Sequence, residues 1–140
     1  MPTASRRLAI LLFTCLAAVA AAADTVDTAA GPIRVEVLAD DLDDPWGLAF
    51  LPGGGMLVTE HGGRLLRLAP DGDIAAVIDG LPTMRTRGQG GLMGIALHPQ
   101  FSDNRMVYLA HAARGSGGWG TEVIRGRLVE DSLADVETVF

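Results

Sequence analysis

The sequence predicts an all-β fold, and within that class about two blades of a β-propeller. From Gly31 onward, short strand-like runs alternate with turn signals, and no helical periodicity is visible beyond the N-terminal segment. The chain also repeats: Gly47–Pro52 aligns with Gly94–Pro99. A period of about 40–50 residues for each four-stranded unit is typical of propeller blades.

The first blade follows from alternation and turn residues. Ile33–Leu38 alternates apolar and charged residues, which predicts a half-buried strand. An apolar run, Trp46–Leu51, lies between two prolines and predicts the next strand. Three more strands are expected after glycine-rich or Pro-Asp-Gly turns, at Met56–Glu60, Arg64–Leu68 and Ile74–Ile78.

The second blade repeats this order. Met93–Pro99 predicts a buried strand. Met106–Leu109 corresponds in sequence to the second strand of the first blade. Val123–Leu128 follows a glycine-rich loop at Gly115–Gly120, and Val136–Phe140 resembles a further strand. Since a propeller needs at least about four blades, we expect an incomplete N-terminal part with exposed apolar edges.

The N-terminal segment predicts a signal peptide over residues 1–23. Arg6 and Arg7 precede the apolar stretch Leu8–Val19, and Ala21–Ala23 fits a small-residue cleavage site. The stretch is too short for a stable membrane span, so we expect cleavage after Ala23 and a periplasmic or secreted protein. Residues 24–32 are expected to form a flexible, unstructured lead-in to a domain spanning residues 33–140.

Composition excludes several classes of chemistry. The single cysteine, Cys15, lies in the predicted signal, so the exported chain has neither a disulfide nor a thiolate nucleophile. No lysine is present, which removes Schiff-base and P-loop chemistry. The net charge is −6 and becomes more negative without Arg6 and Arg7, which disfavours nucleic acid as a partner.

Gln89 is the leading candidate for a binding residue. It lies in Arg87–Leu92, between glycines that let the backbone approach a flat ligand closely. Its amide offers donors and an acceptor to the polar edge of such a ligand. The alternative is a glycine-rich turn with a solvated glutamine.

The histidines and acidic residues predict no metal site of their own. The spacing of His61, His98 and His111 fits no zinc pattern, so turn or structural roles are expected, although His111 could reach a channel mouth. Four aspartates form a cluster that favours a solvated acidic turn over a calcium loop. They are Asp40, Asp41, Asp43 and Asp44.

The aromatic residues divide into two groups. Trp46 and Phe50 share one strand face, which favours core packing between blades over sugar stacking. Trp119 lies among glycines, and it could either line a sugar or cofactor cleft or fold back onto the blade.

A set of motifs in this order resembles the glucose/sorbosone dehydrogenase family, and especially its bacterial aldose sugar dehydrogenase branch. The first group is Asp44–Pro52, Leu57–Glu60 and Gly63–Leu65. The second is Gly80–Pro82, Gly88–Leu92, Ala96–Phe101 and Asn104–Arg105. The likeness covers residues 33–140, and as a set the motifs are specific.

The resemblance implies a six-bladed propeller that binds pyrroloquinoline quinone (PQQ), with calcium helping to bind and activate it. Aldose sugars would be oxidised at C1 to lactones by hydride transfer to PQQ, and the electrons would pass to an unknown acceptor other than NAD. Gln89 matches the family glutamine that contacts PQQ.

The same resemblance implies that much of the machinery lies beyond Phe140. The catalytic histidine, the calcium ligands and the basic partners of PQQ belong to later blades, so this chain alone is expected to be inactive. His61 and Gly62 stand where the family usually has arginine and proline. The alternatives to the enzyme are a non-catalytic propeller that binds a ligand or protein and, with less support, a metal-dependent lactonase.

Overall fold

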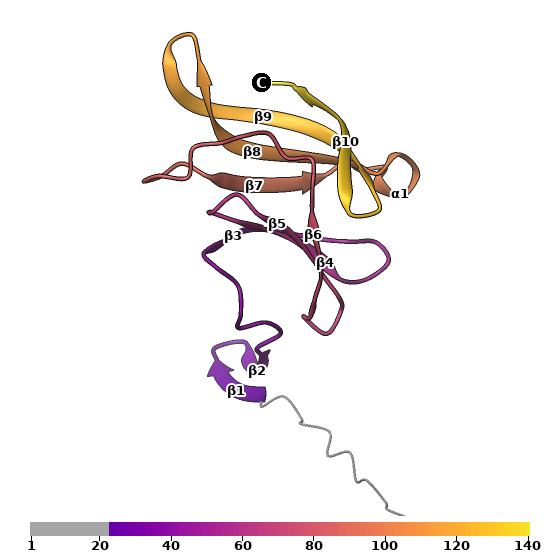
Figure 1. Ribbon diagram of the computed structural model, residues 1–140. Helices are drawn as coiled ribbons and strands as arrows, with labels where there is room; N and C mark the ends of the chain where they lie inside the picture. Colours follow the sequence, from indigo (N-terminus) through magenta and orange to yellow (C-terminus); the bar gives the residue numbers. More distant parts are fainter. Residues whose placement is uncertain (1–22) are drawn as a thin grey trace, which may run out of the picture. The chain divides into compact units, whose positions relative to one another are not determined.

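The computed structural model of the chain describes residues 23–140, and strands form nearly all of its regular structure (Figure 1). Apart from Ala23, the predicted signal peptide lies outside the described residues. The chain divides into a short N-terminal unit that ends at Val37 and a larger unit that begins at Leu38. Among residues 23–140, no helix is both long enough and apolar enough to cross a membrane.

The N-terminal unit contains a hairpin of β1 (Ala23–Thr28) and β2 (Gly31–Glu36). The Thr28 hydroxyl donates to the Gly31 carbonyl at 2.6 Å and accepts from the Ala30 N–H. Gly31 adopts a φ of +116°, which glycine reaches without steric cost. The prediction of an unstructured lead-in over residues 24–32 is therefore wrong, because Thr28 and Gly31 supply a turn that pairs the two strands.

The first four-stranded sheet is antiparallel and follows chain order. It consists of β3 (Pro45–Phe50), β4 (Met56–Glu60), β5 (Leu65–Leu68) and β6 (Ile74–Ile78). A glycine-dependent turn closes β5 to β6, since a Cβ on Gly72 would lie 1.8 Å from the Leu38 carbonyl oxygen. All four strands agree with the predicted ones to within one residue at each end.

The second sheet has the same order and antiparallel pairing. It consists of β7 (Leu92–Leu97), β8 (Met106–Gly115), β9 (Gly118–Val129) and β10 (Ser132–Thr138). The β3, β4 and β5 segments correspond to β7, β8 and β9, so the predicted repeat is confirmed.

Three local predictions for the second sheet are wrong. Gly115–Gly120 forms the closed end of a long hairpin, because Gly115 pairs with Gly118 and leaves a two-residue turn. A one-turn helix, α1 (Phe101–Asn104), lies between β7 and β8. Only Leu92 of β7 is buried, and the rest of that strand is partly or fully exposed.

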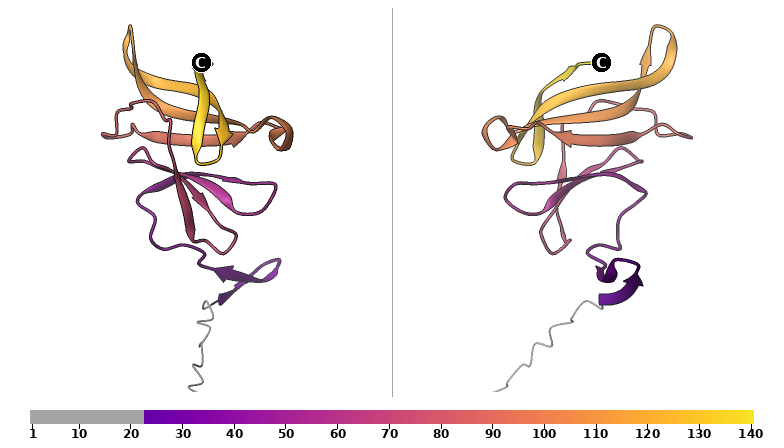
Figure 2. Two further views of the ribbon diagram at one scale, coloured as in Figure 1. Left: turned by 45° about the vertical axis from the view of Figure 1, so that its right-hand side comes forward. Right: turned by 180° about the vertical axis from the view of Figure 1, so that it is seen from behind.

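The two sheets pack face to face, and both views in Figure 2 show them side by side. Their shared core contains Leu57 and Leu65 of the first sheet and Val107 and Leu109 of the second. A polar contact crosses the same interface: the buried Thr59 hydroxyl donates to the Met93 carbonyl at 2.5 Å and accepts from the Gly47 N–H at 2.8 Å. Two such sheets, packed in sequence, are propeller blades.

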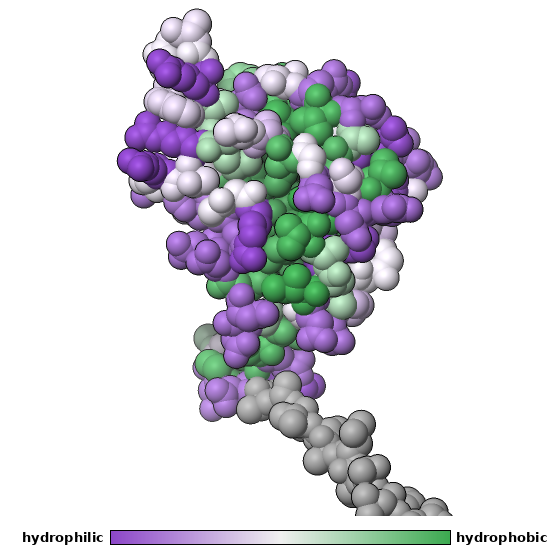
Figure 3. Space-filling model, in the orientation of Figure 1, coloured by the Kyte–Doolittle hydropathy of each residue, from purple (hydrophilic) through white to green (hydrophobic). Residues whose placement is uncertain are grey.

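The other face of β3 remains uncovered within the described residues. Trp46, Leu48 and Phe50 are 52%, 49% and 72% exposed, and apolar side chains gather over the sheets in Figure 3. Trp46 and Phe50 therefore do not pack between these two blades, and their predicted packing between blades would need a neighbour on the other side of β3. Gly47 and Ala49 face the second blade instead, because the strand places alternate residues on opposite faces. The expected exposed apolar surface is present.

Candidate functional site

Gln89 lies in a tight turn that leads from the first blade into β7. Gly88 and Gly91 have φ values of +64° and +110°, which side-chain-bearing residues rarely adopt. The Gly90 N–H donates to the Arg87 carbonyl at 3.1 Å, and the Ala112 N–H donates to the Gly91 carbonyl at 3.0 Å. Both ends of the turn are therefore held by backbone hydrogen bonds, while the Gln89 residue is exposed.

His61, in the turn after β4, supports this loop from the neighbouring blade. Its Nε2 lies 3.1 Å from the Gly88 carbonyl oxygen. The backbones approach closely here, because a Cβ on Gly91 would lie 2.2 Å from the His61 carbonyl oxygen. The His61 ring also stacks on Trp46, with ring centroids 5.8 Å apart. His61 therefore places an aromatic hydrogen-bonding ring between the first blade and the Gln89 turn.

The buried carboxylate of Glu60 fixes the start of the same turn. Glu60 is 1% exposed, and its side chain accepts from the Asp43 N–H at 2.8 Å and from the Arg64 Nε at 2.5 Å. The His61 N–H donates to the Asp44 carbonyl at 3.0 Å. Removing either Glu60 partner would leave part of a buried charge unsatisfied, so the turn is tied to the chain on both sides.

Two hollows border the glutamine turn. One has a volume of about 400 Å³ and is lined by Asp44, Pro45, Trp46, His61 and Gly88. The other, of about 200 Å³, contains Gln89 itself together with Arg85, Arg87 and Trp119. Met93, Ala112 and Thr121 complete this second hollow, with Gly90 and Gly120.

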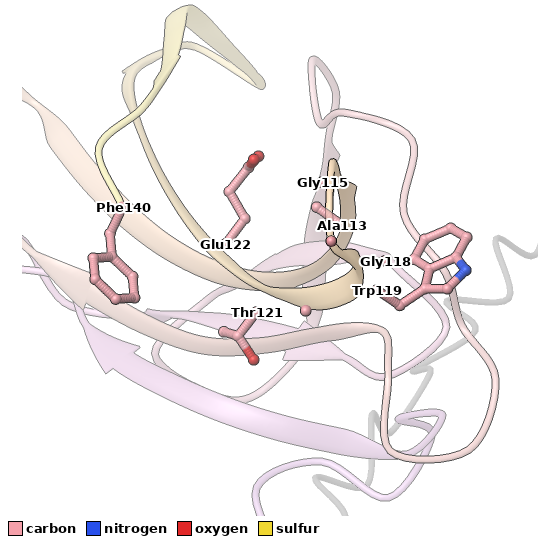
Figure 4. Close-up of a pocket in the computed structure, with 9 residues that line it drawn as sticks. Ala113, Gly115, Gly118, Trp119, Thr121, Glu122 and Phe140 are labelled. Atoms are coloured by element: carbon pink, nitrogen blue, oxygen red, sulfur yellow. The ribbon is translucent and has the colours of Figure 1, made fainter.

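Trp119 lies at the closed end of the β8–β9 hairpin, next to Gly118 (Figure 4). It is 52% exposed, and the Arg85 guanidinium carbon lies 5.3 Å from the centroid of its ring. Of the two roles that the sequence left open for Trp119, the structure favours the one in which it lines a cleft. The tryptophan and Gln89 share one hollow although they are far apart in the sequence.

The other histidines play structural parts. The His98 Nδ1 accepts from the Gln100 N–H at 3.0 Å, in the turn between β7 and α1. His111 is 1% exposed in the core of the second blade, so it does not reach a channel mouth. Its Nε2 lies 3.2 Å from a carboxylate oxygen of Glu122, yet neither ring nitrogen has a hydrogen bond of good geometry within residues 23–140.

The acidic cluster is a solvated turn, as predicted. Asp40, Asp41, Asp43 and Asp44 are exposed. Among the described residues, no group of three or more His, Cys, Asp or Glu side chains is placed to hold a metal ion.

The surface around Gln89 suits a polar, negatively charged ligand. A Cβ on Gly88 would meet nothing within 4 Å, so the turn is open on its outer side. The exposed Gln89 amide can both donate and accept, and two arginines stand next to it. A tricarboxylic quinone such as PQQ matches this chemistry, whereas this part of the chain holds no calcium ligand set.

Two four-stranded antiparallel sheets that follow one another in sequence and pack face to face define this chain as part of a β-propeller protein. The sequence profile described as glucose/sorbosone dehydrogenase matches residues 42–140. The chain therefore belongs to the glucose/sorbosone dehydrogenase family.

Three relatives illustrate the likeness. The aldose sugar dehydrogenase YliI of Escherichia coli K12 is 42% identical over 112 residues, which cover 77% of this chain and 30% of the relative. The apo-form structure of the soluble aldose sugar dehydrogenase from E. coli superposes with a TM-score of 0.70 at 41% identity, covering 75% of this chain and 31% of that one. The PQQ-bound aldose sugar dehydrogenase of Streptomyces coelicolor gives a TM-score of 0.65 at 27% identity, with coverages of 86% and 35%.

The chain thus spans about a third of the length of the relatives that it matches. The all-β prediction and the propeller likeness are confirmed by these neighbours. The sequence singled out Gln89 as the candidate but did not indicate the arginines beside it. The alternation Met84-Arg85-Thr86-Arg87 just before the glutamine turn was the signal that could have indicated them.

Proposed function

We propose that the full-length protein carrying this chain is a PQQ-dependent aldose sugar dehydrogenase that oxidises the sugar at C1 to the lactone. PQQ, when bound, supplies the electron sink that takes the hydride from C1. The sugar hydroxyl proton would go to a base in a later blade, and the electron pair would leave to an acceptor other than NAD. The main support is membership of the family, together with a PQQ-bound relative that covers most of this chain.

Within this chain, Gln89 is the proposed cofactor-binding residue. Its amide would hydrogen-bond the polar edge of the quinone system, and the glycines on either side would let the backbone come close. The His61 ring holds the Gly88 carbonyl and so fixes the position from which Gln89 reaches out. Calcium ligands, the catalytic histidine and further basic partners of PQQ are proposed to lie in later blades, so the 140-residue chain alone should not turn over sugar.

The proposed location of the enzyme is the periplasm or the extracellular medium. The support is the predicted signal over residues 1–23, and cleavage is expected after Ala23. Amino-terminal sequencing of the exported protein should begin at or near Asp24. A mature protein that keeps Arg6 and Arg7 in a cytoplasmic fraction would contradict this localisation.

The function is tested on the full-length protein loaded with PQQ and calcium and assayed with aldoses and a redox dye. Gln89→Ala should weaken PQQ binding by about 1–3 kcal/mol, which is the usual cost of removing one partner of a buried hydrogen bond. Gln100→Ala, in the turn before α1, is the matched control and should leave PQQ affinity unchanged.

Two outcomes separate the possibilities. Wild-type protein that reduces no dye with any aldose would exclude the dehydrogenase, and ligand binding without turnover would favour a non-catalytic propeller. Dye reduction with unchanged PQQ affinity in Gln89→Ala would keep the enzyme but remove Gln89 from its cofactor site.

A further inference from the structure

The arginines around Gln89 differ from most others in the chain. Arg64, Arg67, Arg125 and Arg127 each pair with a carboxylate, as does Arg34 in the N-terminal hairpin. Within residues 23–140, Arg85 and Arg87 form no ion pair, although the protein has 17 acidic residues. Arg85 and Arg87 therefore line one hollow of an acidic protein, and their guanidinium groups have no carboxylate partner among the described residues.

Trp119 holds one of these cations in a defined orientation. The Arg85 guanidinium lies over the indole ring at 5.3 Å, and the Arg85 backbone N–H donates to the Ala112 carbonyl at 3.2 Å. A guanidinium stacked on an aromatic face keeps the N–H groups of its edge available for a carboxylate. The stack thus orients the N–H groups of the Arg85 guanidinium, and no carboxylate among residues 23–140 pairs with them.

The remaining lining groups suit a small oxygen-rich ligand. Arg87 and Gln89 lie in the same hollow, and Thr121 adds a hydroxyl that can donate or accept. The hollow has a volume of about 200 Å³, enough for a carboxylate and part of a ring. Because Gln89 is shared, a ligand held here would lie directly beside the proposed cofactor.

We propose that Arg85 and Arg87, with Trp119 orienting Arg85, form a carboxylate-binding subsite next to Gln89. The carboxylate comes from an acidic sugar such as a uronate, or from the tricarboxylic quinone itself. If the carboxylate belongs to PQQ, the subsite rests on the proposed function. If it belongs to a sugar acid, the subsite does not depend on that function.

The test compares Arg85→Gln and Arg87→Gln with Arg105→Gln in the full-length protein. Arg105 is a matched control, since its guanidinium also lies over an aromatic ring, that of Phe101 at 4.9 Å, and pairs with no carboxylate among the described residues. Glucuronate and glucose binding are measured by titration calorimetry on cofactor-free protein, and PQQ binding by absorbance. Circular dichroism checks that each variant is folded.

For a sugar-acid subsite, each hollow variant should weaken glucuronate binding by about tenfold, with glucose binding unchanged. The glucuronate affinity of the wild type should also fall with added salt, because the pair is partly exposed. For a cofactor subsite, the same variants should weaken PQQ binding by about tenfold while the wild type shows no preference for glucuronate. Arg85→Lys should recover only part of either loss, because an ammonium lacks the planar fork.

The subsite is overturned if Arg85→Gln and Arg87→Gln are folded and match Arg105→Gln for glucuronate and for PQQ. That result leaves the proposed dehydrogenase standing if the wild type still binds PQQ and reduces dye. Conversely, a wild type that binds no PQQ would remove the proposed function, and selective glucuronate binding through Arg85 and Arg87 would still support the subsite.

Discussion

At the scale of single residues, the site depends on contacts between blades. The Gln89 turn belongs to the second blade, but the ring that holds its Gly88 carbonyl, His61, belongs to the first. The His61 ring is itself held by Trp46 at the start of β3. The position of Gln89 is therefore set by packing that joins both sheets, in addition to the local turn.

His61→Phe tests this dependence, because phenylalanine keeps a ring to stack on Trp46 but removes the Nε2 contact. The lost hydrogen bond is worth about 0.5–1.5 kcal/mol, so the turn should open about two- to tenfold more often. Trypsin cleavage after Arg87, followed by mass spectrometry under native conditions, measures that opening. His61→Gln, which restores an N–H donor, should slow the cleavage again, and equal rates for all three proteins would show that His61 does not hold the turn.

At the scale of strands, the buried polar pair between β4 and β7 joins the blades. Thr59 is fully buried, and its hydroxyl serves both the Gly47 N–H and the Met93 carbonyl. This single side chain satisfies two backbone groups from two strands, which an apolar residue of the same shape cannot do.

Thr59→Val should therefore destabilise the full-length protein by about 1–3 kcal/mol, since the part-buried Gly47 N–H and Met93 carbonyl lose their hydrogen bonds to the Thr59 hydroxyl. The measurement is the shift in denaturant midpoint, monitored by tryptophan fluorescence. Thr121→Val is the control, because Thr121 is exposed in the hairpin, and a change within about 0.5 kcal/mol is expected there. A Thr59→Val protein as stable as the control would mean that the interface relaxes around the valine.

The same scale shows what the sequence could predict. Met56–Glu60 and Ile74–Ile78 were predicted at their observed bounds, because β-propensity and flanking turn residues are local properties. The β1–β2 hairpin and the closed end of β8–β9 were missed, because glycine and small polar residues are equally common in irregular loops and in the tight turns of hairpins. Gln89 could be proposed as a binding residue from its flanking glycines, whereas the proximity of its turn to Trp119 and His61 arises from sheet pairing and blade packing.

At the scale of the whole molecule, the uncovered face of β3 is the surface on which we expect a further blade to pack. Trp46, Leu48 and Phe50 form an apolar stripe on one strand face, and each is about half or more exposed. A propeller buries each sheet between two neighbours, so the other face of this blade should meet a blade that lies outside the 140 residues.

The substitution Phe50→Ser should therefore act in opposite directions in two contexts. In residues 24–140 expressed alone, it should lower binding of the apolar dye ANS and reduce aggregation, because it removes the most exposed side chain of the stripe. In the full-length protein it should cost several kcal/mol, near the roughly 3–5 kcal/mol typical of losing a buried phenylalanine. ANS fluorescence and denaturant midpoints measure the two effects, with Val129→Ser, at the partly exposed end of β9, as the control. A loss of stability below about 0.5 kcal/mol in the full-length protein would show that no further blade covers this face of β3. The ring of blades would then have to close in another way.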